Sequence, residues 1–172
     1  MELHAPRSWL EREDEVARPE REARLEWIVA HYPAAEGFLL SGGWLSKQLL
    51  EEAKYGFVYG QYLAVAMLGV AFVERLLAAQ LYAAGRDDLE RASARDLLAE
   101  ALRCGWLSQE DFDRFDCMRR LRNPLVHFRR PLAADTIEAR AVGQNSHPDA
   151  VLEKDAREIL EGVLRLLGRS AV

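Results

Sequence analysis

The sequence FVYGQYLAVAMLGVAFVERLLAAQLYAA, residues 57–84, is the longest apolar segment of the chain. It lacks strand-like alternation and is apolar on nearly all sides, which predicts a long buried helix. Gly60 and Gly69 within it predict close approach by a neighbouring helix, and Gly85 is a natural stop. Its most apolar part, residues 62–73, is shorter than the ~20 residues that span a bilayer. We therefore expect the core helix of a soluble, cytoplasmic protein, with no membrane association.

Helix signals continue on both sides of this segment. The predicted helices cover residues 20–31, 44–54, 57–84, 93–104, 108–122 and 146–167. Residues 137–145 are left for a short irregular or extended piece. This order predicts an all-α fold, an up-and-down helical bundle of five to six helices. Residues 1–18 are dominated by charges and predict a flexible N-terminal arm or a short exposed helix, so that residues 19–172 form a single domain.

Local signals predict several helix ends. Pro19 is expected to open the first helix, and Gly56 to bend or end the second, since glycine costs ~1 kcal/mol in a helix interior. Ser93 and Ser108 each precede an acidic residue by three positions, which is the pattern of a capping box. Pro148 is expected to open the last helix.

Composition restricts the kinds of site that the chain can carry. The net charge is −5 over 172 residues, so any nucleic-acid-binding surface must be local. Cys104 and Cys117 lack the spacing of a zinc site or a disulfide framework, and both are expected to pack as small apolar side chains in a reducing compartment. We predict no metal and no cofactor, because the histidines outside residues 119–130 show no ligand spacing: His4, His31 and His147.

Positive charge is concentrated in residues 119–130, RRLRNPLVHFRR. No acidic residue lies between Asp116 and Asp135, whereas five arginines and one histidine do. The planar guanidinium group suits phosphate oxygens, and histidine transfers protons near neutral pH. This segment is therefore the candidate functional site.

Pro124 is expected to break the helix in the middle of this segment. On an unbroken helix Arg122 and His127 point roughly 140° apart. Proline disfavours helix at the preceding Asn123, and an asparagine–proline pair suits the start of a new helix. The break would bring Arg122 and His127 towards one pocket, and the new helix N-terminus would face an anion.

Arg122-Asn123, three further residues and His127 match the R-x4-H motif of HEPN domains, and the chain resembles this family over roughly residues 44–131 and the last helix. HEPN domains place the motif after a long apolar helix with alanines and a glutamate, which residues 57–84 with Glu74 resemble. The resemblance implies metal-independent RNA cleavage in a homodimer with facing motifs. It assigns His127 as general acid or base, Arg122 to the phosphate charge, and Asn123 to orienting the histidine or holding the phosphate.

The resemblance also implies a toxin or phage-defence role, with RNA as substrate and an antitoxin protein as a partner. One branch of the family has a tyrosine two positions after the histidine, which a nucleotidyltransferase antitoxin modifies. That position is Arg129 here, which argues against this control and leaves a different antitoxin open.

Each of these residues also has a structural interpretation. Arg122 would pair with Asp116 or a helix C-terminal carbonyl, and His127 would pack in a turn. Glu74 needs a partner if it is buried, either a motif arginine or a neighbour of Arg75, and a supporting role beside the site is the alternative. The flanking arginines are either a solvated basic face or RNA-backbone contacts: Arg119, Arg120, Arg129 and Arg130. The second candidate function is a non-catalytic HEPN-like module that binds protein or nucleic acid, and a buried ion pair at Arg122 would favour it.

Overall fold

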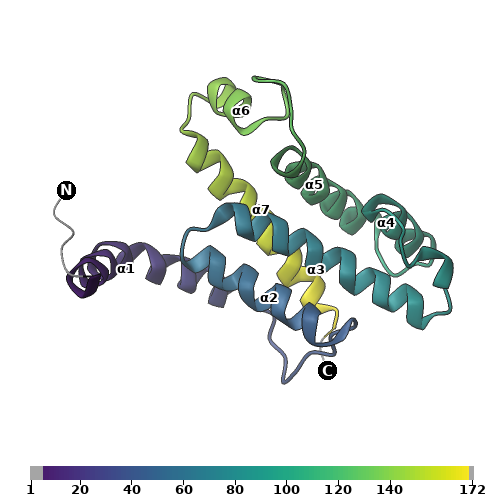
Figure 1. Ribbon diagram of the computed structural model, residues 1–172. Helices are drawn as coiled ribbons and strands as arrows, with labels where there is room; N and C mark the ends of the chain where they lie inside the picture. Colours follow the sequence, from purple (N-terminus) through teal and green to yellow (C-terminus); the bar gives the residue numbers. More distant parts are fainter. Residues whose placement is uncertain (1–5, 171–172) are drawn as a thin grey trace.

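The computed structural model describes residues 6–170 and is all-α (Figure 1). Within these residues it contains seven α-helices, a short 3₁₀ helix η1 (Asp87–Leu89) and no strand. The α-helices are α1 (Pro6–His31), α2 (Gly43–Val58), α3 (Tyr62–Ala83), α4 (Ala94–Arg103), α5 (Gln109–Val126), α6 (Ile137–Gln144) and α7 (Pro148–Gly168).

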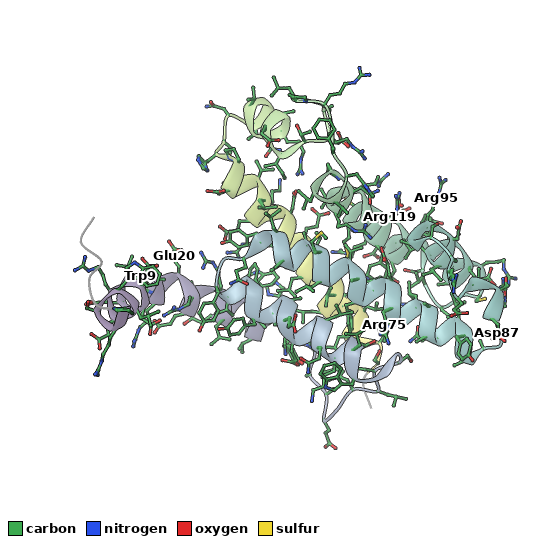
Figure 2. The ribbon with its side chains drawn as sticks, in the orientation of Figure 1. Trp9, Glu20, Arg75, Asp87, Arg95 and Arg119 are labelled. Carbon is green, nitrogen blue, oxygen red and sulfur yellow. The ribbon has the colours of Figure 1, made fainter. Side chains whose placement is uncertain are left out.

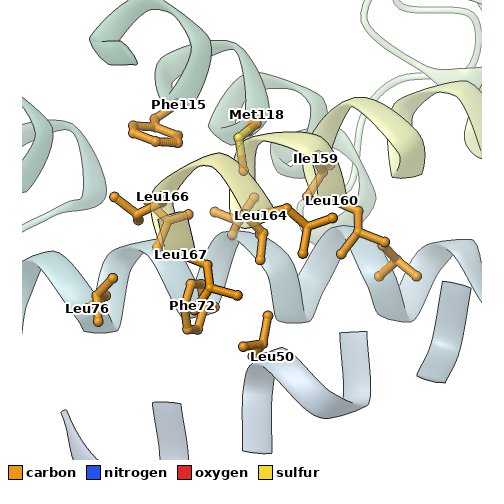
Figure 3. Close-up of a cluster of buried hydrophobic side chains, with 14 of the residues drawn as sticks. Leu50, Phe72, Leu76, Phe115, Met118, Ile159, Leu160, Leu164, Leu166 and Leu167 are labelled. Atoms are coloured by element: carbon orange, nitrogen blue, oxygen red, sulfur yellow. The ribbon is translucent and has the colours of Figure 1, made fainter. Parts of the chain in front are cut away.

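The apolar helix α3 is the centre of the molecule, as its sequence predicts. It packs against α2, α4, α5 and α7, and Figure 3 shows the shared core of α2, α3, α5 and α7 side chains. Phe72 and Leu76 of α3 are 0 % exposed, and Phe115 and Met118 of α5 are 2 % and 1 % exposed. The packing of these two α5 side chains therefore places the segment that precedes the motif against α3.

Gly69 confirms the predicted close approach between helices. A Cβ atom at Gly69 would lie 2.7 Å from Cγ2 of Ile159 on α7. Gly60 has a different role from the one expected, since it lies in the turn between α2 and α3 with φ +71°. The helix end predicted at Gly56 is therefore wrong, and residues 57–84 form the end of α2, a turn and α3.

The capping signals are confirmed. The Ser93 hydroxyl accepts a hydrogen bond from the Asp96 backbone, and Ser108 and Asp111 form a reciprocal capping box at the start of α5. Pro148 opens α7 after the cap at His147. Helix starts that depend only on neighbouring residues were thus predictable.

Asp111 joins the start of α5 to α7. Its side chain is 0 % exposed and accepts hydrogen bonds from Ser108 and Arg169, and from Nε of Arg165 at 2.9 Å. Burial opposes ionisation of this carboxyl, but hydrogen bonds from Ser108 and Arg165 outweigh it and hold its pKa below the usual value.

One prediction at the N-terminal end of the chain is wrong. The helix start expected at Pro19 is wrong, because α1 runs through Pro19. Nη2 of Arg21 donates to the Asp14 carbonyl at 3.1 Å and to Oδ1 of Asp14 at 2.8 Å, and these contacts join residues on either side of Pro19. The predicted arm is therefore helical from Pro6, and its residues 1–5 lie outside the described part. The N-terminal part of α1 projects from the other helices (Figure 1), and Figure 2 labels Trp9 and Glu20 on this helix.

The piece expected to be irregular, residues 137–145, is mostly the helix α6. Thr136 caps it by accepting a hydrogen bond from the Ala139 backbone. Arg140 of α6 forms two hydrogen bonds of 2.6 Å to Asp155 of α7, which is 1 % exposed. This buried pair ties α6 to the bundle.

By length and composition α3 is also the one helix in residues 6–170 that could cross a membrane. About half of its most apolar window, 44 %, is buried by the other helices. Both a core helix and a membrane-spanning helix meet this description.

Candidate functional site

The motif lies at the C-terminal end of α5, and α5 does not break at Pro124. The helix continues to Val126, and His127 follows as its C-cap residue with φ −108° and ψ 129°. The backbone N–H of His127 still donates to the Asn123 carbonyl at 3.0 Å. The predicted break at Pro124 is therefore wrong, and so is the anion-binding helix N-terminus expected there.

The position of Pro124 explains why the helix tolerates it. Proline in a helix removes one hydrogen bond and its ring crowds the preceding turn. Pro124 lies in the last turn, so α5 loses one backbone hydrogen bond near its end, while Phe115 and Met118 are buried in the core earlier in the helix. The packing of α5 thus outweighs the local preference of the asparagine–proline pair.

Arg122 connects α5 to α3 through Glu74. Its Nη2 atom donates to Oε1 of Glu74, and the side chains are 19 % and 31 % exposed respectively. Of the partners considered for Glu74, a motif arginine is therefore the one found. This partly buried ion pair is the arrangement that favours a structural role for Arg122.

Asn123 contacts Arg119 on its own helix. The amide orientation that satisfies both of its polar atoms has the nitrogen donating to the Arg119 carbonyl and the oxygen accepting from Arg119 Nη1, each at 3.1 Å. Arg119 also pairs with Asp116 at 2.7 Å. The Asn123 side chain thus supports Arg119, and its link to His127 is through the backbone carbonyl.

His127 is the exposed part of the motif. Its imidazole has no hydrogen bond or ion pair to any side chain or carbonyl within residues 6–170. Arg122 lies within α5 and pairs with Glu74, whereas His127 follows the helix with extended φ and ψ. No hydrogen bond joins the Arg122 and His127 side chains in the described part of the chain.

The flanking arginines are mostly paired with acids. Arg119 and Arg120 share Asp116, and Arg129 pairs with Asp135 at 2.9 Å. Figure 2 shows Arg119 on α5. Arg130 is exposed and its side chain has no partner in the described part of the chain. Five arginines against three carboxylates leave a local net charge of +2.

The loop after the motif contains a residue to which the sequence analysis assigned no role. Phe128 is 90 % exposed, the highest fraction among the large apolar side chains of residues 6–170. Leu132 in the same loop is 67 % exposed and has φ +60°, a region that costs a bulky L residue about 1–2 kcal/mol. One signal was present in the sequence, since Phe128 lies between a histidine and two arginines.

Phe128 and Leu132 line one open groove. Its volume is about 600 Å³, and α3, α5, α6 and α7 all contribute to it. The other lining residues are Leu63, Pro124, Leu125, Arg129, Arg130, Pro131, Thr136, Ile137, Glu138 and Leu152. The groove therefore begins at the end of α5, directly beside the motif.

The cysteines lie away from this groove. Cys104 is exposed, so the prediction that it packs as an apolar side chain is wrong. The Cys117 thiol donates to Glu158 at 3.3 Å, and burial raises its pKa. No three histidine, cysteine or acidic side chains gather into a metal-binding group within residues 6–170.

The chain matches no protein-family model, and no curated protein or solved structure is significantly similar to it. The resemblance to HEPN domains therefore depends on Arg122, Asn123 and His127 and on their position after an apolar helix that carries Glu74.

Proposed function

We propose that the chain is a HEPN-type endoribonuclease that cleaves RNA without a metal, using Arg122 and His127. The observation that carries the proposal is the exposed imidazole of His127, which has no partner in the described residues and lies in the arginine-rich segment of an acidic chain. A histidine that has no hydrogen-bond partner and lies near arginines is suited to transfer a proton at a phosphate.

The reaction needs one base and one acid. The ribose 2′-hydroxyl attacks the adjacent phosphorus and loses its proton to the base. The bond from phosphorus to the 5′ oxygen breaks, and that oxygen takes a proton from the acid. The products are a 2′,3′-cyclic phosphate and a 5′-hydroxyl. His127 serves as acid or base, and Arg122 stabilises the charge that develops on the phosphate oxygens.

A second copy of the chain completes this site in the proposal. In one copy Arg122 pairs with Glu74, and a single imidazole supplies a single proton-transfer group. Two α5 ends that face each other place an arginine of one copy near a histidine of the other and supply both acid and base. A homodimer is therefore part of the proposal.

The Arg122–Glu74 ion pair favours the second candidate, a non-catalytic helical module that binds protein or nucleic acid. An arginine held by a carboxylate of the same fold has a sufficient structural role. In the nuclease, a phosphate oxygen competes with Glu74 for the guanidinium group. The nuclease therefore needs Arg122 for cleavage, whereas the non-catalytic module needs it for stability alone.

The decisive experiment measures RNA cleavage with chelator present for the wild type, His127→Ala and Arg122→Ala. Loss of the histidine is expected to slow cleavage about 10²–10⁴-fold, and loss of the arginine about 10²–10³-fold. His147→Asn is the matched control, because it removes another exposed imidazole while keeping a capping side chain on α7. Equal cleavage by the wild type and His127→Ala would refute the catalytic proposal.

Mixing the wild type with His127→Ala tests the dimer. If the two copies supply the acid and the base to one site, a mixed dimer of wild type and His127→Ala contains a single imidazole and is inactive, so co-expression with excess His127→Ala should suppress cleavage by the wild type. Undiminished cleavage by mixed dimers would contradict an active site shared between copies.

The toxin or phage-defence role and its antitoxin partner are tested in cells. Expression of the wild type is expected to stop growth and degrade RNA, and His127→Ala to permit growth at the same protein level. Equal toxicity of both would contradict a role that depends on cleavage.

A further inference from the structure

Phe128 is an exposed aromatic residue beside the proposed catalytic group. It follows His127 directly, and its ring is 90 % exposed. Single exposed apolar side chains are common on soluble proteins. An aromatic ring in this position is different, because it offers a flat apolar face one residue from the imidazole.

The loop that carries Phe128 is shaped around the groove. Leu132 adopts φ +60° while its side chain stays 67 % exposed, so burial of this side chain does not account for the strained backbone. Both residues line the groove of about 600 Å³. Strained backbone beside a binding surface is typical of functional loops.

One guanidinium group on the groove is available to a phosphate. Arg129 and Arg130 line the groove together with one acid, Glu138. Arg129 pairs with Asp135, whereas Arg130 is exposed and has no side-chain partner within residues 6–170. Aromatic faces interleaved with free guanidinium groups suit an unpaired nucleic-acid strand, because bases stack on the ring while cations contact phosphates. A duplex offers no free base face to Phe128.

We propose that Phe128 is a stacking platform for an unpaired base of single-stranded RNA, with Arg130 contacting the neighbouring phosphate. This rests on the proposed function, because it assigns the nucleotide next to the cleaved bond to this groove. Phe128 is thus a specificity residue that selects unpaired RNA, and it takes no part in proton transfer.

Binding is measured in the full-length His127→Ala protein, so that cleavage does not consume the probe. The probe is a single-stranded RNA of about 12 nucleotides that carries 2-aminopurine, and a hairpin duplex of the same RNA is the comparison. Phe128→Ala and Phe128→Leu are expected to weaken single-strand binding about tenfold to a hundredfold, and Phe128→Trp to preserve it. Quenching of 2-aminopurine is expected only with an aromatic residue at this position.

The matched control is Val142→Ala, which removes an exposed apolar side chain of α6 that does not line the groove. It is expected to bind the probe like the parent protein. Arg130→Ala is expected to reduce the slope of log K against log salt concentration by about one, which corresponds to the loss of one phosphate contact. Circular dichroism checks that each variant is folded.

Several results would overturn the stacking site. These are parent-like binding by Phe128→Leu, equal effects on single strand and duplex, and no binding of either RNA by the parent. Capture of an acidic peptide through Phe128 in place of RNA would also overturn it and indicate a protein partner. If RNA binding depends on Phe128 but cleavage does not depend on His127, the platform stands and the catalytic proposal fails. If cleavage depends on His127 and the Phe128 variants bind like the parent, the catalytic proposal stands and the stacking site fails.

Discussion

Replacing Glu74 with glutamine tests how much the fold depends on its ion pair with Arg122. The change keeps the shape of the side chain and removes its charge. Exposed ion pairs contribute about 0–1 kcal/mol, and removing one partner of a fully buried pair costs about 3–5 kcal/mol. The exposed fractions of 31 % for Glu74 and 19 % for Arg122 place this pair between those limits. We expect Glu74→Gln to lower the free energy of unfolding by about 1–2 kcal/mol.

Thermal and urea unfolding measure this change. For a chain of this size 1 kcal/mol corresponds to about 2–4 °C, so the melting temperature should fall by about 2–8 °C. Glu52→Gln on α2 is the matched control, because Glu52 is exposed and has no ion pair among the described residues. Its effect should stay within about 0.5 kcal/mol.

A double-mutant cycle with Arg122→Gln isolates the interaction. If the two side chains stabilise each other, the second substitution costs less once the first is present, with a coupling energy of about 0.5–2 kcal/mol. A coupling energy of zero would refute the reasoning that joins α3 to α5 through this pair, and Arg122 would then be free for another role.

Three further predictions concern α3, α5 and the buried acid. Gly69→Ala should lower stability by about 1–2 kcal/mol, since overpacking against Ile159 exceeds the gain in helix propensity; an unchanged urea midpoint would contradict this close approach. Pro124→Ala should raise stability by about 1–2 kcal/mol, because α5 is already helical there and regains a backbone donor. A lower melting temperature would mean that the fold requires proline at this position. Asp111 has a lowered pKa in the fold, so its contribution is full above the unfolded value of about 3.9 and is lost as pH falls through the folded-state pKa. Acid titration of Asp111→Asn should therefore show a smaller loss of stability below about pH 4 than the wild type, and an identical loss would contradict this.

The features that were predictable from sequence depend on neighbouring residues. The N-cap at Ser93 and the capping box at Ser108 were predictable because both hydrogen-bonding groups lie within four positions of each other. The core role of α3 was predictable for a related reason, since a continuous apolar helix has to be buried by others or by lipid.

The predictions that failed around α5 and α6 were decided by contacts distant in sequence. Pro124 suggested a helix end, yet α5 continues to Val126 with Phe115 and Met118 buried in the core. Pro19 likewise suggested a helix end, yet α1 continues through it. The helix α6 was missed because part of its stability comes from the buried pair of Arg140 and Asp155.

The candidate site combines both kinds of feature. The arginine-rich segment and its histidine were visible in the sequence, and they remain candidate residues. Their surroundings were not predictable, because the partner of Arg122 is Glu74 on α3 and the exposure of His127 depends on where α5 ends.

The most direct test of the central claim is the chemistry of the RNA ends that the purified protein produces in the presence of chelator. Cleavage through the 2′-hydroxyl predicts a 2′,3′-cyclic phosphate and a 5′-hydroxyl, formed by the wild type and lost in His127→Ala. Ends with a 3′-hydroxyl and a 5′-phosphate, or equal product from His127→Ala, would contradict it.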